Sequence, residues 1–181
     1  MKWNKNKDVI ALMVGHGFSI DGSWDPGTTY RGYTEAALML PIVKEAVKYL
    51  RSKKIKVLTD ADKDNNRNMI SCVQWANRKS AKLYMSVHCD YFKASAGVYP
   101  LYISKAGKAF AKSVGKSVAK DMKMKYKGTG KRADLYELTG TDMPAVIFET
   151  GSIKKDLKNL KLSKKYGKAL GEAIYKYITK E

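Results

Sequence analysis

The chain has 181 residues, which suits one domain that can bury a hydrophobic core without disulfide support. Hydrophobic residues make up 44% of the sequence, a globular composition that excludes a disordered chain. Lys and Arg number 35 against 17 for Asp and Glu, a net charge of +18, and the two cysteines form no CxxC pair, which excludes a zinc finger.

The first half of the chain alternates apolar runs with helical patterns. Residues 9–14 form a continuous apolar run, which predicts a strand buried on both faces. A loop rich in Gly, Asp and Pro follows over 18–32. Thr34 is the expected N-cap of a helix over 35–52, in which Pro41 predicts a kink or a break. Further along we expect a strand over 55–59, a polar loop over 60–68, a helix over 69–81 and a strand over 83–88.

The second half continues the alternation. A strand is expected over 97–104, where Pro100 favours an edge position, and a long basic helix over 105–126. A short strand over 135–138, a buried strand over 144–149 and a final helix over 163–179 complete the pattern. We therefore predict an α/β fold in a single domain over 1–181. Its sheet is twisted, mostly parallel and of about six strands, with helices on both faces.

The N-terminus and the charge limit where the chain acts and what it meets. Residues 1–8 are polar and lack the order of a signal peptide, and we expect no membrane-spanning segment. The net charge of +18 attracts polyanions, which include nucleic acid, anionic membranes and phosphate-rich polymers. Solvated helix faces explain the same lysines equally well.

Ionisable residues stand where the buried strands end. His16 follows the first strand, His88 ends the third and Glu149 ends the last, while Glu35 begins the helix after the first loop. Because ligands bind outside the carboxyl ends of parallel strands, we expect these four side chains to meet at one edge of the sheet. His16 and His88 are the only histidines in the chain.

Two histidines and a carboxylate around an open position are the usual ligands of catalytic zinc in hydrolases. A further carboxylate nearby can act as a general base. The set is dispersed along the chain, so it is not an HExxH motif. The alternative is that each histidine is a hydrogen-bonded polar residue at a strand end. Glu137 is a second candidate for the catalytic carboxylate, although we expect it in the middle of a strand.

Short motifs surround these residues in a particular order. They are Gly15-His16-Gly17, Asp25-Pro26-Gly27, Ala76-Asn77 before the third strand, and the run Pro144 to Gly151. From about residue 9 to residue 177 this order resembles the zinc-dependent N-acetylmuramoyl-L-alanine amidases. The resemblance implies one zinc ion held by His16, Glu35 and His88, with Glu149 as the catalytic carboxylate.

The same resemblance implies a hydrolase that cleaves the amide between N-acetylmuramic acid and L-alanine in bacterial peptidoglycan. It would act as a monomer on the Gram-positive cell wall, as an autolysin outside the cell or as an endolysin released from the cytoplasm during lysis. The chain departs from the family pattern at Asp90, often Asn, and at Gln74, often Arg. Its loop from His16 to Asp25 is also longer than usual, so a divergent member of the family is expected.

Three further residues are candidates for substrate binding: Asp90, Lys131 and Arg132. Asp90 lies two residues after His88, so on a strand it shares that face, whereas Cys89 faces away as a buried thiol. Anionic wall polymers are a second candidate partner for the basic surface. Two rival functions remain: a zinc peptidase or deacylase acting on another wall component, and a non-enzymatic nucleic-acid-binding module. The second leaves the placement of both histidines unexplained, so no nucleic-acid partner is expected.

Overall fold

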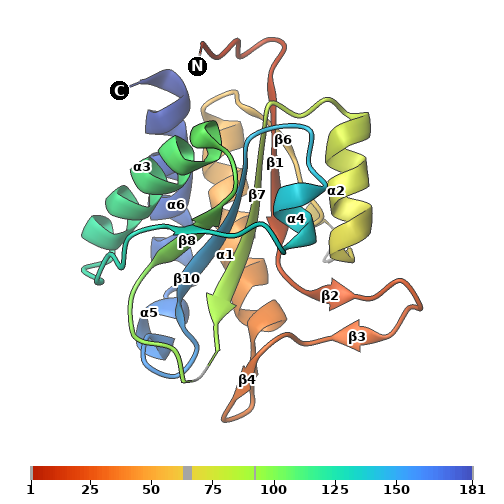
Figure 1. The fold of residues 1–181 in the computed structure, drawn as a ribbon. Helices are drawn as coiled ribbons and strands as arrows, with labels where there is room; N and C mark the ends of the chain where they lie inside the picture. Colours follow the sequence, from red (N-terminus) through yellow and green to blue (C-terminus); the bar gives the residue numbers. More distant parts are fainter. Residues whose placement is uncertain (1, 63–66, 92, 181) are drawn as a thin grey trace.

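The computed structural model describes residues 2–62, 67–91 and 93–180. Its centre is a six-stranded sheet in the order β6-β1-β7-β10-β8-β9 (Figure 1). Neighbouring strands are parallel except for β10 and β8, which are antiparallel. This confirms the predicted mostly parallel sheet. The strands are β1 (Val9–Val14), β6 (Lys56–Leu58), β7 (Leu83–Asp90), β8 (Tyr99–Tyr102), β9 (Gly130–Lys131) and β10 (Ala145–Ser152).

Helices cover both faces of the sheet, as predicted (Figure 1). The larger core cluster joins one face to α1 (Glu35–Ser52), α3 (Lys105–Asp121) and α6 (Ser163–Thr179). The smaller one joins the other face to α2 (Met69–Arg78) and α4 (Tyr136–Thr139). Side chains of β7 alternate between the two clusters, with Met85 and Val87 in the larger and Tyr84 in the smaller. A short helix, α5 (Leu157–Leu160), precedes α6.

The strand expected over 135–138 is wrong, because these residues enter the helical turn α4. Leu135 and Leu138 are three residues apart, which places both on one side of a turn of helix. The sheet position beside β8 belongs instead to the two-residue strand β9. Pro100 is therefore not on the outermost strand. However, β9 pairs only with Leu101 and Tyr102. The missing N–H of Pro100 therefore leaves no gap in the hydrogen bonds between β8 and β9.

The segment before α1 is more ordered than the loop expected over 18–32. It forms two small hairpins, β2 (Gly17–Phe18) with β3 (Trp24–Asp25) and β4 (Thr29–Tyr30) with β5 (Tyr33–Thr34). The β2–β3 hairpin projects sideways from the end of β1 (Figure 1). The hydroxyl of Thr34 caps α1 by accepting the Ala37 amide at 3.2 Å.

Helix α1 runs unbroken through Pro41, where a kink or a break was predicted. Two helices end earlier than predicted: α2 at Arg78 rather than at residue 81, and α3 at Asp121 rather than at residue 126. The polar loop expected over 60–68 includes residues 63–66, which lie outside the described residues. Over the described parts of the chain, none of the helices is long and apolar enough to cross a membrane.

Candidate metal centre and active site

The structure brings three of the predicted residues into direct contact at the carboxyl edge of the sheet. His16 follows β1, His88 lies in β7 and Glu35 is the first residue of α1. One possible ligand atom from each lies within 4.8 Å of the other two. Glu149 in β10 is the register partner of His88 in β7, so the fourth residue lies on the adjacent strand.

The backbone packs closely around these side chains. His16 has a left-handed conformation with φ of 62°, which costs a residue with a side chain about 1–2 kcal/mol. Gly27, with φ of 67°, lies so close that a Cβ there would be 2.6 Å from His16 Cδ2 and 2.7 Å from Glu35 Oε2. A Cβ on Gly15 would collide with the His88 imidazole. Both positions require glycine, because a side chain there would displace the imidazoles or the Glu35 carboxylate.

Glu35 lies between the two imidazoles. Its Oε1 is 3.0 Å from His88 Nδ1, and its Oε2 is 3.4 Å from His16 Nε2. The amides of Cys89 and Thr28 donate to the same carboxylate at 3.0 and 3.1 Å. Four groups from three separate segments therefore fix one buried acid.

Each histidine also contacts a second carboxylate on its far side. His16 Nδ1 is 2.8 Å from Asp25 Oδ2, and His88 Nε2 is 3.1 Å from Glu137 Oε2. The nitrogens that face Glu35 are consequently His16 Nε2 and His88 Nδ1.

The charges in this cluster reinforce one another. Burial favours the neutral form of Glu35, but the hydrogen bond from His88 and the charges of both histidines lower its pKa below the usual value. Burial likewise disfavours charge on His88, yet the carboxylates of Glu137 and Glu35 raise its pKa well above the ordinary value. The cluster thus concentrates buried negative charge around two imidazoles.

These residues fit a zinc ion. Two imidazole nitrogens and one carboxylate converge, and this is the donor set of catalytic zinc sites. The remaining nitrogen of each ring contacts a carboxylate, as is usual for histidines that bind metal. A divalent cation at the centre would also neutralise part of the negative charge gathered there.

Glu149 differs from the other acids in having an unsatisfied oxygen. The residue is partly buried, and its Oε2 is covered by protein without a hydrogen-bond partner in the part of the chain that is described. Burial raises its pKa to about 8, opposed by the charge of His88 and helped by Glu35, Asp90 and Glu137. A carboxyl group with such a pKa can both take up and release a proton near neutral pH.

The three candidates for substrate binding have contacts elsewhere. Asp90 accepts the Tyr91 amide at 2.9 Å and lies 3.6 Å from Lys127 Nζ. Lys131 is exposed on β9, and the exposed Arg132 makes two hydrogen bonds to Asp134 at 2.7 and 2.6 Å. Their binding role stays a prediction. Cys89 is a free, buried thiol in the larger core cluster, on the opposite face of β7 from Tyr84, as predicted.

Sequence reasoning missed the contacts of two acids. In the sequence, Asp25 stands out only as part of the motif Asp25-Pro26-Gly27, and Glu137 only as a second candidate for the catalytic carboxylate. The signal for Glu137 was a single carboxylate in an otherwise apolar segment, between Leu135 and Leu138. Its partner could not be inferred, because the helical turn that aims it at His88 was not predicted.

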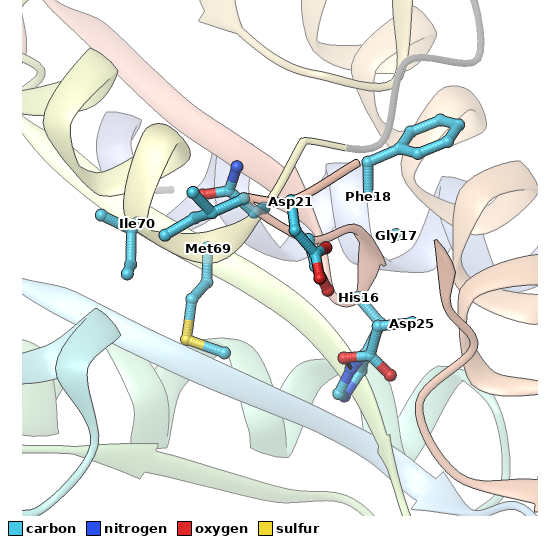
Figure 2. Close-up of a pocket in the computed structure, with 10 residues that line it drawn as sticks. His16, Gly17, Phe18, Asp21, Asp25, Met69 and Ile70 are labelled. Carbon is cyan, nitrogen blue, oxygen red and sulfur yellow. Dashed lines mark hydrogen bonds and ion pairs between the residues drawn. The ribbon is translucent and has the colours of Figure 1, made fainter. Parts of the chain in front are cut away.

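A cavity of about 480 Å³ opens beside the histidine and carboxylate pair. His16 and Asp25 lie at one end of it, and Met69 and Ile70 at the other (Figure 2). Of the described large apolar side chains that are exposed, three line this cavity: Phe18, Ile20 and Met69. The cavity therefore offers an apolar wall directly next to the candidate metal ligands.

A His-Glu-His donor set beside a buried acid, at the carboxyl edge of a parallel sheet, is typical of a metal-dependent hydrolase. A family model described as N-acetylmuramoyl-L-alanine amidase matches residues 10–180. The chain therefore belongs to the N-acetylmuramoyl-L-alanine amidase family, whose members are hydrolases of bacterial peptidoglycan.

Solved structures of such amidases have the same fold. The N-acetylmuramoyl-L-alanine amidase AmiC2 of Nostoc punctiforme is 25% identical, with a TM-score of 0.83 over 96% of this chain and 98% of that one. An N-acetylmuramoyl-L-alanine amidase from Clostridium difficile 630 is 23% identical, with a TM-score of 0.82 over 97% and 96%. The catalytic domain of the CD27L endolysin, which targets Clostridia difficile, is 18% identical, with a TM-score of 0.77 over 93% and 97%.

A curated relative is longer than this chain. An uncharacterized 38.4 kDa protein of Clostridium perfringens is 30% identical over 185 residues, which are 95% of this chain and 52% of that protein. The chain thus spans about half the length of the curated relatives it matches.

Proposed function

We propose that this chain is a zinc-dependent amidase that hydrolyses the bond between the lactyl carbonyl of N-acetylmuramic acid and the nitrogen of L-alanine. The observation that carries the proposal is the convergence of His16 Nε2, Glu35 and His88 Nδ1, with the unsatisfied carboxyl of Glu149 on the adjacent strand. Membership of the amidase family supports the choice of bond.

In the proposed reaction, water adds across the amide, which leaves a carboxylic acid on the sugar and a free amine on L-alanine. Zinc, when bound by His16, Glu35 and His88, supplies a Lewis acid that activates water and polarises the carbonyl. Glu149 accepts a proton from the attacking water and delivers a proton to the departing nitrogen. Glu35 and the two histidines keep fixed positions through the hydrogen bonds described above.

The cavity beside His16 is the proposed place for the substrate next to the scissile bond. Sugar rings and alanine methyl groups present apolar surface, and Phe18, Ile20 and Met69 offer a matching wall. Among the described residues, this wall is one of few places where large apolar side chains are exposed on a strongly basic protein. Its removal should therefore affect substrate binding more than folding.

The basic surface supports a second contact with the wall. Five lysines repeat along the exposed side of α3, at positions 105, 108, 112, 116 and 120. Such a row fits a phosphate-rich wall polymer, and its contribution would fall steeply with salt. We propose that the chain works as a monomer on the Gram-positive wall, either outside the cell or after release during lysis.

The test is digestion of purified peptidoglycan, with fragments identified by mass spectrometry and zinc measured in the purified protein. The proposal expects about one zinc per chain and intact stem peptides that begin with a free L-alanine amine. Chelation should stop the reaction and added zinc restore it, and Glu149→Gln should keep the zinc but lose turnover. The matched control is Asp121→Asn, which removes an exposed carboxylate at the end of α3 and should behave as wild type. Cuts within the stem peptide would instead indicate a zinc peptidase. DNA binding without bound zinc would indicate a non-enzymatic nucleic-acid-binding module.

A further inference from the structure

Glu137 is a buried acid beside the candidate metal centre that the proposed reaction does not use. It lies in α4, and its side chain is 6% exposed. Its Oε2 is 3.1 Å from His88 Nε2, and its Oε1 accepts a hydrogen bond from the Tyr84 hydroxyl at 3.0 Å. Tyr84 and His88 are four residues apart in β7, so their side chains project from the same face of the sheet. Glu137 thus bridges two residues of one strand.

These contacts distinguish Glu137 from Glu149. Both oxygens of Glu137 are engaged, one by a ring nitrogen and one by a phenol, whereas Glu149 has a covered oxygen with no partner among the described residues. These two contacts hold the carboxylate of Glu137 toward His88 and Tyr84 rather than toward the centre. Any role of Glu137 in the metal centre is therefore exerted through His88.

Glu137 can act on His88 by determining which ring nitrogen carries a proton. A neutral imidazole has one nitrogen that carries a proton and one that carries a lone pair. An ionised carboxylate can only accept, so Glu137 favours a proton on Nε2 of His88. Without metal, Nδ1 can also donate, to Glu35 at 3.0 Å. Nδ1 faces the centre, so a metal bound there would take the place of its proton, while Glu137 keeps the proton on Nε2.

His16 shows the same pattern with a weaker partner. Its Nδ1 contacts Asp25, so its Nε2 faces Glu35. The side chain of Asp25 is 47% exposed, however, while that of Glu137 is almost covered. Solvent screens the His16–Asp25 contact more than the His88–Glu137 contact. The interaction of Glu137 with His88 should therefore be the stronger of the two.

We propose that Glu137 is a positioning residue that fixes His88 with its proton on Nε2 and presents Nδ1 to the metal. Tyr84 assists by holding Glu137. This inference rests on the proposed zinc-dependent function. Loss of a carboxylate behind a metal-binding histidine typically weakens metal affinity about 10–100-fold, and that is the effect expected for Glu137→Ala.

The test measures zinc affinity by competition with a chelator for wild type, Glu137→Ala, Glu137→Gln and Tyr84→Phe. Glutamine keeps an oxygen that can accept from Nε2, so this variant should lose only a few-fold. Tyr84→Phe removes one hydroxyl and should also lose a few-fold. Asp25→Asn, at the exposed contact, should lose less than Glu137→Ala. Thermal unfolding of each chelated variant reports whether it is folded.

The second readout is the nitrogen-15 spectrum of the two imidazoles, which is simple because the chain has only two histidines. In wild type loaded with zinc, His88 should show a slowly exchanging proton on Nε2. In zinc-loaded Glu137→Ala this proton should exchange rapidly, while His16 stays unchanged.

Equal zinc affinity and an unchanged His88 spectrum in folded Glu137→Ala would overturn the inference. So would a variant Glu137→Gln that is as impaired as Glu137→Ala, because accepting the Nε2 proton would then not be what matters. Failure of the wild type to bind zinc would instead overturn the proposed function. In that case the Nε2 proton of the chelated protein would still report whether Glu137 holds the ring.

Discussion

Replacing Glu149 by glutamine should change how the stability of the metal-free protein depends on pH, as well as abolish turnover. Burial raises the pKa of Glu149 from 4.5 to about 8. The folded protein therefore binds one proton more than the unfolded chain between these two values. Stability from this group is fully present below its unfolded pKa of 4.5 and is lost as pH rises toward about 8.

The magnitude follows from this linkage. One excess proton in the folded state lowers the free energy of unfolding by ~1.4 kcal/mol for each pH unit. Between about pH 5 and about pH 7.5 the loss amounts to roughly 3 kcal/mol for wild type. The amide of Glu149→Gln does not titrate, so that variant should lack this part of the decline.

The measurement is urea unfolding of chelated wild type, Glu149→Gln and Asp121→Asn across this pH range. Wild type and Asp121→Asn should lose about 3 kcal/mol more than Glu149→Gln, on the linkage given above. The same Glu149→Gln protein, loaded with zinc, should digest peptidoglycan at least about 100-fold more slowly than wild type. Parallel stability curves for wild type and Glu149→Gln would refute the buried, proton-binding state of this acid.

Three other substitutions probe the surroundings of the site. Gly15→Ala places a methyl group against the His88 ring, so it should cost about 1–3 kcal/mol in unfolding free energy and weaken zinc binding; unchanged values for both would contradict the packing. Phe18 lines the cavity and is 45% exposed, so Phe18→Ala should raise KM for peptidoglycan with little change in stability. Leu162 is 48% exposed but lies outside the cavity, so Leu162→Ala should leave KM unchanged. Equal KM values for the two variants would exclude the cavity as a substrate site. Thr34→Ala removes the cap of α1 and should cost about 1 kcal/mol by urea unfolding; a loss under about 0.3 kcal/mol would mean that the cap is dispensable.

Much of this protein could be predicted from local pattern. The apolar run over 9–14 and the helical periodicity over 35–52 and 163–179 reappear as β1, α1 and α6, because each is long enough for one period to dominate. The secondary structure of short segments could be predicted less reliably. The four residues from 135 to 138 are too few for hydrophobic periodicity to distinguish a strand from a turn of helix. In the folded protein they lead into the helical turn α4, which tertiary packing stabilises.

For the candidate site, the sequence by itself determined which residues would gather. His16 follows β1, and His88 and Glu149 lie near the ends of β7 and β10, which continue two and three residues further than predicted. The carboxyl ends of parallel strands meet at one edge, so the three residues come together there. Only the tertiary structure decided which atoms face one another. The left-handed backbone of His16 and the helical turn that carries Glu137 depend on contacts between segments far apart in the chain. Side-chain orientation at a site is set by such long-range packing, which local periodicity does not encode.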